Sequence, residues 1–83
     1  MKTIVLTTAA ARQMDALPAP ARTVLSEALA LYAVEGIGDV KRLSGRDGFR
    51  LRVGDYRVIF DEDARTILAV YVGRRATTTY KRN

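Results

Sequence analysis

The pattern of hydrophobic and polar residues begins with one short apolar run and then takes up a helical period. Residues 4–6, Ile-Val-Leu, are typical of a short buried strand. Thr7 or Thr8 can then cap a helix, because a threonine side chain accepts a hydrogen bond from a free N–H group of the first helical turn. We expect this helix to run from residue 9 to about residue 16. Its buried face should comprise Ala10, Met14 and Leu17.

A second helix is predicted after a short turn that contains two prolines. Pro18 ends the first helix, and Pro20 suits the first turn of the next one, where its missing N–H group costs no hydrogen bond. The second helix should continue to Glu35 and end at Gly36, since glycine readily takes the left-handed conformation that follows helices. The residues expected on its buried face are Val24, Leu25, Ala28, Leu31 and Tyr32. Together the two helices form a helical hairpin.

The second half of the chain changes to an alternating period, which is typical of strands. Residues 37–48 contain three glycines and mixed charges, and we expect them to form a loop. Gly54-Asp55 is a two-residue hairpin signal, and strands are predicted at 49–53, 56–60 and 66–72. The last of these runs is almost uniformly apolar, which predicts a central strand covered on both faces. The order β-α-α-β-β-β implies an α+β fold, with a helical hairpin packed on one face of a small, mainly antiparallel sheet.

The hairpin turn decides which side chains share a face of the sheet. With two residues in the turn, Arg52 pairs with Arg57 and Arg50 pairs with Ile59. Arg50, Arg52 and Arg57 then lie on one face, two of them directly opposite each other. Because like charges opposed across a strand pair are destabilising, this arrangement favours an anionic ligand. The alternative is a solvated face on which the arginines turn toward nearby carboxylates.

Composition narrows the chemistry further. The 83 residues are expected to form a single domain, residues 1–83, and they include no cysteine and no histidine. Disulfides, thiolate or imidazole metal sites and the usual general base are therefore excluded, and we expect no metal and no cofactor. Residues 41–83 carry eleven basic and five acidic side chains, against three and four in residues 1–40. Eleven of the fourteen cations are arginines, which bind phosphate well, so nucleic acid or an acidic protein is the favoured partner.

Targeting signals are weak. The first apolar run is too short for the core of a signal peptide, and no stretch approaches the roughly 18 apolar residues of a membrane span. We therefore expect a cytoplasmic protein without a membrane partner.

Residues 39–80 resemble the RelE/ParE superfamily, the toxins of bacterial and archaeal toxin–antitoxin pairs. The similarity rests on VKRLSG, on the hairpin RLRVGDYRVIF and on the strand ending in VGRR. It implies a RelE-like fold and a cognate antitoxin as partner. RelE-like members are ribosome-dependent endoribonucleases that cut mRNA, whereas ParE-like members poison DNA gyrase. The resemblance thus implies an mRNA interferase of a type II toxin–antitoxin system, which acts with the ribosome and mRNA as partners. A gyrase poison without nuclease activity is the alternative.

The resemblance also assigns site residues. RelE-like proteins use basic residues on the second strand, an arginine on the third, an arginine just after the last strand and a tyrosine near the C-terminus. These positions match Arg50 and Arg52, Arg57, Arg75 and Tyr80, and imply catalytic roles for the last three. The residues expected to bind RNA phosphates are Arg50, Arg52, Lys41, Arg42, Arg74, Lys81 and Arg82. The second-strand residues are often lysines in the family, and the arginines found here stay protonated, which leaves the general base unassigned.

Cleavage by attack of the RNA 2′-OH needs alignment, stabilisation of the phosphorane and proton transfer. Arginines can supply the second requirement. Tyr80 serves as the base if nearby cations lower its pKa; otherwise water moves the proton and the ribosome supplies the alignment. A generic RNA-binding module is disfavoured, because Tyr56 and Tyr71 are expected to be core residues that form no stacking platform.

Overall fold

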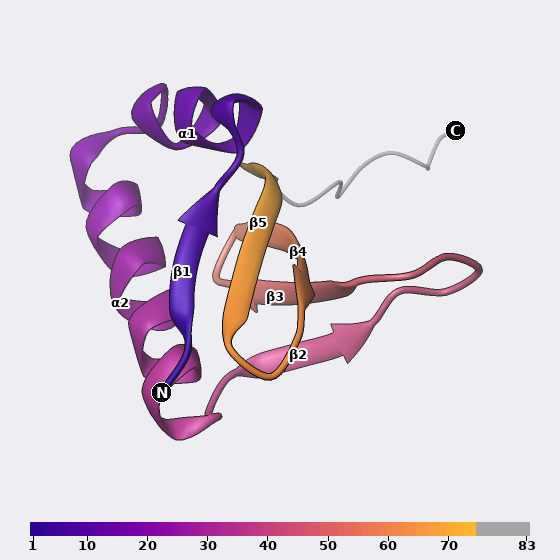
Figure 1. The fold of residues 1–83 in the computed structure, drawn as a ribbon. Coiled ribbons are helices and arrows are strands. Elements are labelled where there is room, and N and C mark those ends of the chain that lie inside the picture. Colours follow the sequence, from indigo (N-terminus) through magenta and orange to yellow (C-terminus); the bar gives the residue numbers. More distant parts are fainter. Residues whose placement is uncertain (75–83) are drawn as a thin grey trace.

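The computed structural model describes residues 1–74, in which two helices pack on one side of a five-stranded sheet (Figure 1). The helices are α1 (Thr8–Asp15) and α2 (Ala19–Glu35). The strands are β1 (Thr3–Leu6), β2 (Asp39–Arg42), β3 (Phe49–Val53), β4 (Tyr56–Glu62) and β5 (Thr66–Arg74). Their order is β1-β5-β4-β3-β2, with β1 parallel to β5 and the other pairs antiparallel. The predicted α+β fold is confirmed. No helix in this part of the chain is both long and apolar enough to cross a membrane.

The helix boundaries follow the predicted caps. The Thr7 side chain accepts a hydrogen bond from the Ala10 N–H at 3.1 Å, and α2 ends at Gly36, whose φ is 72°. The buried face of α2, however, consists of Leu25, Leu29 and Ala33. Val24 and Leu31 were predicted to be buried but are 51% and 45% exposed, so those two predictions were wrong. Apolar residues occur around most of this helix, and the sequence pattern therefore fixes its rotation only loosely.

Strand β2 lies within the segment that was predicted to be a loop. Asp39–Arg42 pairs with β3 along its whole length, so the loop prediction is wrong for these four residues. Three of the four side chains are charged, and Val40 alone is apolar. Charged residues are common on edge strands, where they discourage pairing with other chains, and they remove the alternation by which strands are recognised.

The core lies between the helices and the sheet. It is formed by Ala10, Met14, Leu25, Leu29, Ala33, Leu51, Val58, Phe60, Ile67, Ala69 and Val72. Phe60 is fully buried at its centre, where its ring lies 5.6 Å from the rings of both Tyr32 and Phe49. Side chains that alternate with these core residues on β3, β4 and β5 point to the opposite face of the sheet, which is called the outer face below.

The β3–β4 register agrees with the sequence prediction, whereas the β4–β5 register shifts by one residue. Arg52 pairs with Arg57 and Arg50 pairs with Ile59, on either side of a turn that begins at Gly54 with a φ of 56°. On β5, Ile59 pairs with Tyr71 whereas Phe60 pairs with Ala69, so Val70 is an extra residue, a β-bulge. Strand β5 is central, as predicted, but helices cover only one of its faces.

A hydrogen-bonded cluster joins the N-terminal segment, α2 and β4. The Tyr32 hydroxyl donates to the Glu62 carboxylate at 2.6 Å, and Lys2 forms an ion pair with the same carboxylate. Burial raises the pKa of Glu62, but the hydrogen bonds from Lys2 and Tyr32 outweigh it and hold this pKa below its ordinary value. Burial and the bond to Glu62 raise the pKa of Tyr32 to about 12.

This cluster predicts how stability depends on pH. Because the folded-state pKa of Glu62 is lowered, its contribution is complete above the unfolded pKa of about 4.3 and is lost as the pH falls further. We expect Glu62→Gln to lower the free energy of unfolding at pH 7 by about 1–3 kcal/mol and by less at pH 3. Urea unfolding at both pH values measures this difference. The exposed neighbour Asp61, changed to Asn, is the matched control, and an equal loss for Glu62→Gln at both pH values would contradict the expectation.

Candidate functional site

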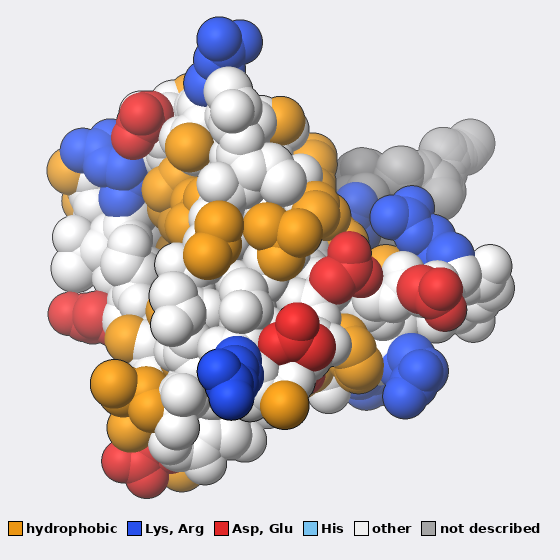
Figure 2. Space-filling view, in the orientation of Figure 1, with side chains coloured by type: hydrophobic (Ala, Val, Ile, Leu, Met, Phe, Trp, Pro, Cys, Tyr) orange, Lys and Arg blue, Asp and Glu red, His pale blue; other side chains and the backbone are white. Residues whose placement is uncertain are grey.

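Four basic side chains share the outer face of the sheet. In the β2–β3 register Lys41 lies opposite Arg50, and in the β3–β4 register Arg52 lies opposite Arg57. The three arginines therefore lie together on the face away from the helices, as the hairpin predicted. Figure 2 shows Lys and Arg side chains on the right of the molecule, around the loop between β2 and β3. The four residues Lys41, Arg50, Arg52 and Arg57 are called the cationic face below.

The arginines of this face differ in their partners. Arg52 Nε donates to Asp39 Oδ2 at 2.9 Å, across the β2–β3 pair. By contrast, Nε and Nη2 of Arg50 and Nε of Arg57 are buried from solvent and have no hydrogen-bond partner within residues 1–74. A charged donor that is buried without a partner costs several kcal/mol, roughly 1–3 for each lost hydrogen bond and more for a charge. An anion bound here would satisfy these donors, so the pattern of burial points to a binding site.

Two other cations that were predicted to bind RNA lie elsewhere. Arg42 pairs with Phe49 in the β2–β3 register, and its guanidinium carbon lies 5.3 Å from the centroid of the Phe49 ring. Both side chains lie on the helix side of the sheet, because along their strands they alternate with Lys41 and Arg50. Arg74 lies 5.4 Å from the centroid of the Tyr56 ring and 3.9 Å from Asp55. The structure thus brings Lys41, Arg50, Arg52 and Arg57 together, and it places Arg42 and Arg74 on the opposite face.

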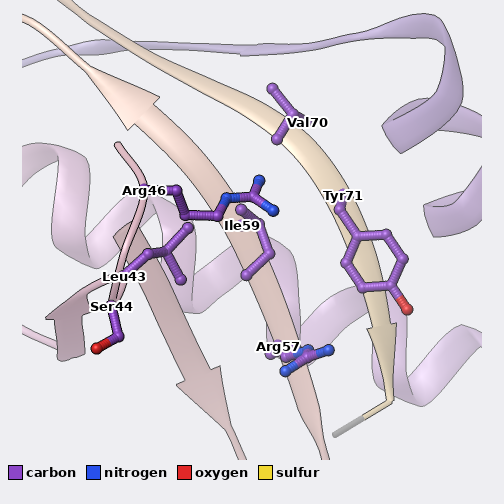
Figure 3. A pocket seen from close by; sticks show the side chains of 7 residues that line it. All are labelled: Leu43, Ser44, Arg46, Arg57, Ile59, Val70 and Tyr71. Carbon is purple, nitrogen blue, oxygen red and sulfur yellow. The ribbon is translucent and has the colours of Figure 1, made fainter. Parts of the chain in front are cut away.

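A cavity of about 580 Å³ opens on the outer face beside Arg57 (Figure 3). Its walls come from β4, from β5 and from the loop that follows β2. The lining residues are Leu43, Ser44, Arg46, Arg57, Ile59, Val70 and Tyr71. Cavities of about 300–1,000 Å³ with mostly apolar walls and a few polar groups are typical of small-molecule and cofactor sites. The site therefore combines a charged surface with an adjoining, partly apolar hollow.

Tyr71 belongs to this cavity, and its prediction as a core residue was wrong. Ile67, Ala69 and Val72 are buried on the helix side, and strict alternation after Ala69 would have buried Tyr71 as well. The bulge at Val70 shifts the alternation by one residue and turns Tyr71 to the outer face. The sequence signal for this arrangement is Gly73, because a glycine inside a strand often marks a close approach by another group.

The remaining predicted site residues, Arg75, Tyr80, Lys81 and Arg82, lie outside the described residues. Within residues 1–74, no three His, Cys, Asp or Glu side chains are grouped so that they could hold a metal ion.

Comparison with solved structures places the fold among toxin structures. A chain of the toxin–antitoxin complex RelBE2 from Mycobacterium tuberculosis is 28% identical and has a TM-score of 0.76, over 89% of this chain and 98% of that one. A chain of the archaeal RelE–RelB complex from Pyrococcus horikoshii is 22% identical, with a TM-score of 0.77 over 93% and 98% of the two chains. A chain of the YoeB dimer from Staphylococcus aureus is 17% identical, with a TM-score of 0.73 over 89% of this chain and 97% of that one. No protein-family model and no curated protein sequence matches.

The chain therefore has the RelE-like fold, and its predicted resemblance to the RelE/ParE toxin superfamily is confirmed. At 22% and 17% identity, the similarity to the RelE–RelB and YoeB structures establishes the fold alone. One fold can serve different functions, so the function has to be argued from the site.

Proposed function

We propose that this protein is the toxin of a type II toxin–antitoxin system and acts as a ribosome-dependent mRNA endoribonuclease in the cytoplasm. The observation that carries the proposal concerns Arg50 and Arg57. Nε and Nη2 of Arg50 and Nε of Arg57 are buried and have no hydrogen-bond partner within residues 1–74. A phosphodiester supplies the oxygen acceptors that these donors lack. The 28% identity with a chain of a toxin–antitoxin complex, over nearly the whole of that chain, supports the toxin assignment.

The proposed reaction is an attack of the RNA 2′-OH on the adjacent phosphorus. A bond forms between the 2′-oxygen and phosphorus, the bond from phosphorus to the 5′-oxygen breaks, and the products are a 2′,3′-cyclic phosphate and a 5′-OH. The 2′-OH proton passes to a base, and the departing 5′-oxygen takes up a proton. Arg57 and Arg75 would stabilise the negative charge on the phosphorane, which is usually the largest catalytic contribution.

Proton transfer has few candidates in this chain. With neither histidine nor cysteine present, Tyr80 or a water molecule is the proposed base. The arginines at positions 50 and 52 are too basic to release a proton, so their proposed role is to bind and orient the RNA backbone. Alignment of the 2′-OH is assigned to the ribosome, because holding reacting groups in line contributes several kcal/mol, up to about 7–11 in favourable cases.

A cognate antitoxin is the proposed second partner. The cationic face of a toxic enzyme has to be neutralised until it is needed, and an acidic or amphipathic segment laid across it would do so. Such a segment would offer carboxylates to the same donors that bind phosphate in the active state.

The proposal predicts which process fails first when the protein is induced without an antitoxin. Protein synthesis should stop within minutes, while supercoiling of a reporter plasmid stays normal. Radiolabelled amino-acid incorporation and plasmid topology, measured in one culture, report the two processes together. Loss of supercoiling before translation slows would instead indicate a gyrase poison, and normal growth with abundant soluble protein would contradict both functions.

A further inference from the structure

Tyr71 forms one wall of the cavity on the outer face, and the reaction described above gives it no task. We propose that Tyr71 stacks on a nucleobase of a single-stranded RNA whose phosphate is held by Arg57, so that the cavity is the base-binding part of the site. This inference rests on the proposed function and specifies how its substrate is held.

The Tyr71 ring is held in place from two sides. A Cβ atom at position 73 would lie 2.3 Å from the Tyr71 hydroxyl oxygen and 2.7 Å from Cζ, so the ring lies directly against the Gly73 backbone. The Arg57 guanidinium carbon lies 5.8 Å from the ring centroid, within the range of a cation–π contact. A ring that is already oriented loses little conformational entropy when a base stacks on it.

The cavity walls suit a base in both shape and chemistry. Leu43, Ile59 and Val70 give apolar contact to a flat ring, and Ser44 and Arg46 add polar groups from the loop after β2. Figure 3 shows these side chains arranged around one hollow, with Tyr71 on the β5 side. Stacking on an aromatic ring depends little on the identity of the base. The Arg46 guanidinium extends over Ile59 toward β5 in Figure 3, where it can contact the edge of a base.

Arg57 connects the base-binding cavity to the cationic face. In Figure 3 its guanidinium and the Tyr71 hydroxyl both point toward the end of β5. A cation for the phosphate and an aromatic face for the base therefore lie within the span of one nucleotide. Bases in a duplex are already stacked and paired, so only an unpaired strand can place a base here.

Fluorescence can test the stacking directly, because the chain contains no tryptophan. The Tyr71→Trp variant of the full chain carries a single reporter at the proposed site. A short single-stranded oligonucleotide with 2′-O-methyl groups, which block cleavage, should quench this fluorescence, and an abasic oligomer of equal length should not. Tyr56→Trp is the matched control, since Tyr56 also lies beneath an arginine, Arg74, but on the opposite face. Equal quenching at both positions, or none at position 71, overturns the inference.

Binding measurements separate this inference from the proposed function. By fluorescence anisotropy, Tyr71→Phe should bind the labelled oligonucleotide like the wild type, and Tyr71→Ala about tenfold more weakly. Gly73→Ala, which pushes the ring aside, should resemble Tyr71→Ala. None of the three should change binding of the abasic oligomer. Thermal melts confirm folding, and Tyr71→Leu replaces the alanine variant if the latter is unfolded.

The other possible results of the binding measurements are also decisive. Wild-type binding that is equal for the two oligomers refutes base stacking and leaves phosphate recognition by the cationic face intact. A loss of abasic binding in Tyr71→Ala would show a merely structural role for the ring, and it also overturns the inference. Wild-type protein that binds neither oligomer also overturns the inference, whereas the proposed function fails only if mRNA on translating ribosomes stays uncut.

Discussion

Arg57→Ala is expected to slow RNA cleavage about a hundredfold without weakening the fold. A preorganised charged donor aimed at the phosphorane typically contributes about 2.7–4 kcal/mol to the transition state, which corresponds to that factor or more. Arg57 Nε is buried without a hydrogen-bond partner within residues 1–74, so its removal relieves a desolvation cost. The free energy of unfolding should therefore stay the same or rise slightly. Single-turnover cleavage on ribosomes and urea unfolding measure the two quantities.

The matched control for this experiment is Arg65→Ala. It removes the same charge from an exposed position in the turn between β4 and β5, far from the cationic face. If Arg65→Ala cleaves RNA at the wild-type rate and Arg57→Ala does not, the loss of cleavage is due to the site. A general effect of the lower net charge would then be excluded. If soluble Arg57→Ala cleaved RNA as fast as the wild type, Arg57 would have no place in the chemistry.

Phe60→Ala should be the most damaging single change to stability. Phe60 is fully buried and packs against the rings of Tyr32 and Phe49, which belong to α2 and β3. Truncating a buried phenylalanine costs about 3–5 kcal/mol, because apolar contact is lost and a cavity remains. Small domains have a free energy of unfolding of about 5–15 kcal/mol, so this loss removes much of the total. Urea denaturation at pH 7 measures it.

Val24→Ala provides the comparison, because Val24 is 51% exposed on α2 although the sequence pattern predicted it to be buried. Its cost should be within about 0.5 kcal/mol, as for other exposed positions. Similar losses for the two variants would mean that the core has been assigned to the wrong residues.

The parts of the site that depend on local geometry were predictable from the sequence. Gly54-Asp55 sets a two-residue turn, and once the turn is known the pairing of Arg52 with Arg57 follows from counting. The face shared by Arg50, Arg52 and Arg57 is a consequence of the two-residue period of strands. The caps of α1 and α2 were also predictable, because Thr7 and Gly36 act on residues that are close to them in the sequence.

The missed features depend on tertiary structure or on a break in the pattern. Strand β2 exists because its backbone pairs with β3, and its charged side chains give no periodic signal. The rotation of α2 is decided by packing against the sheet, so Val24 and Leu31 were misassigned. Tyr71 was misassigned because one inserted residue, Val70, reverses the alternation, and a bulge is fixed by the partner strand. The position of Tyr71 in the cavity wall therefore could not be predicted from the sequence.

The most direct test of the central claim is primer extension on a defined mRNA in a purified translation system. The protein, separated from its antitoxin, should cut the mRNA only when ribosomes are translating it, and the cleaved fragment should end in a 2′,3′-cyclic phosphate. Arg57→Ala should cut the mRNA about a hundredfold more slowly under the same conditions. An unchanged mRNA with the wild-type protein, together with DNA gyrase inhibited in a parallel supercoiling assay, would contradict the account.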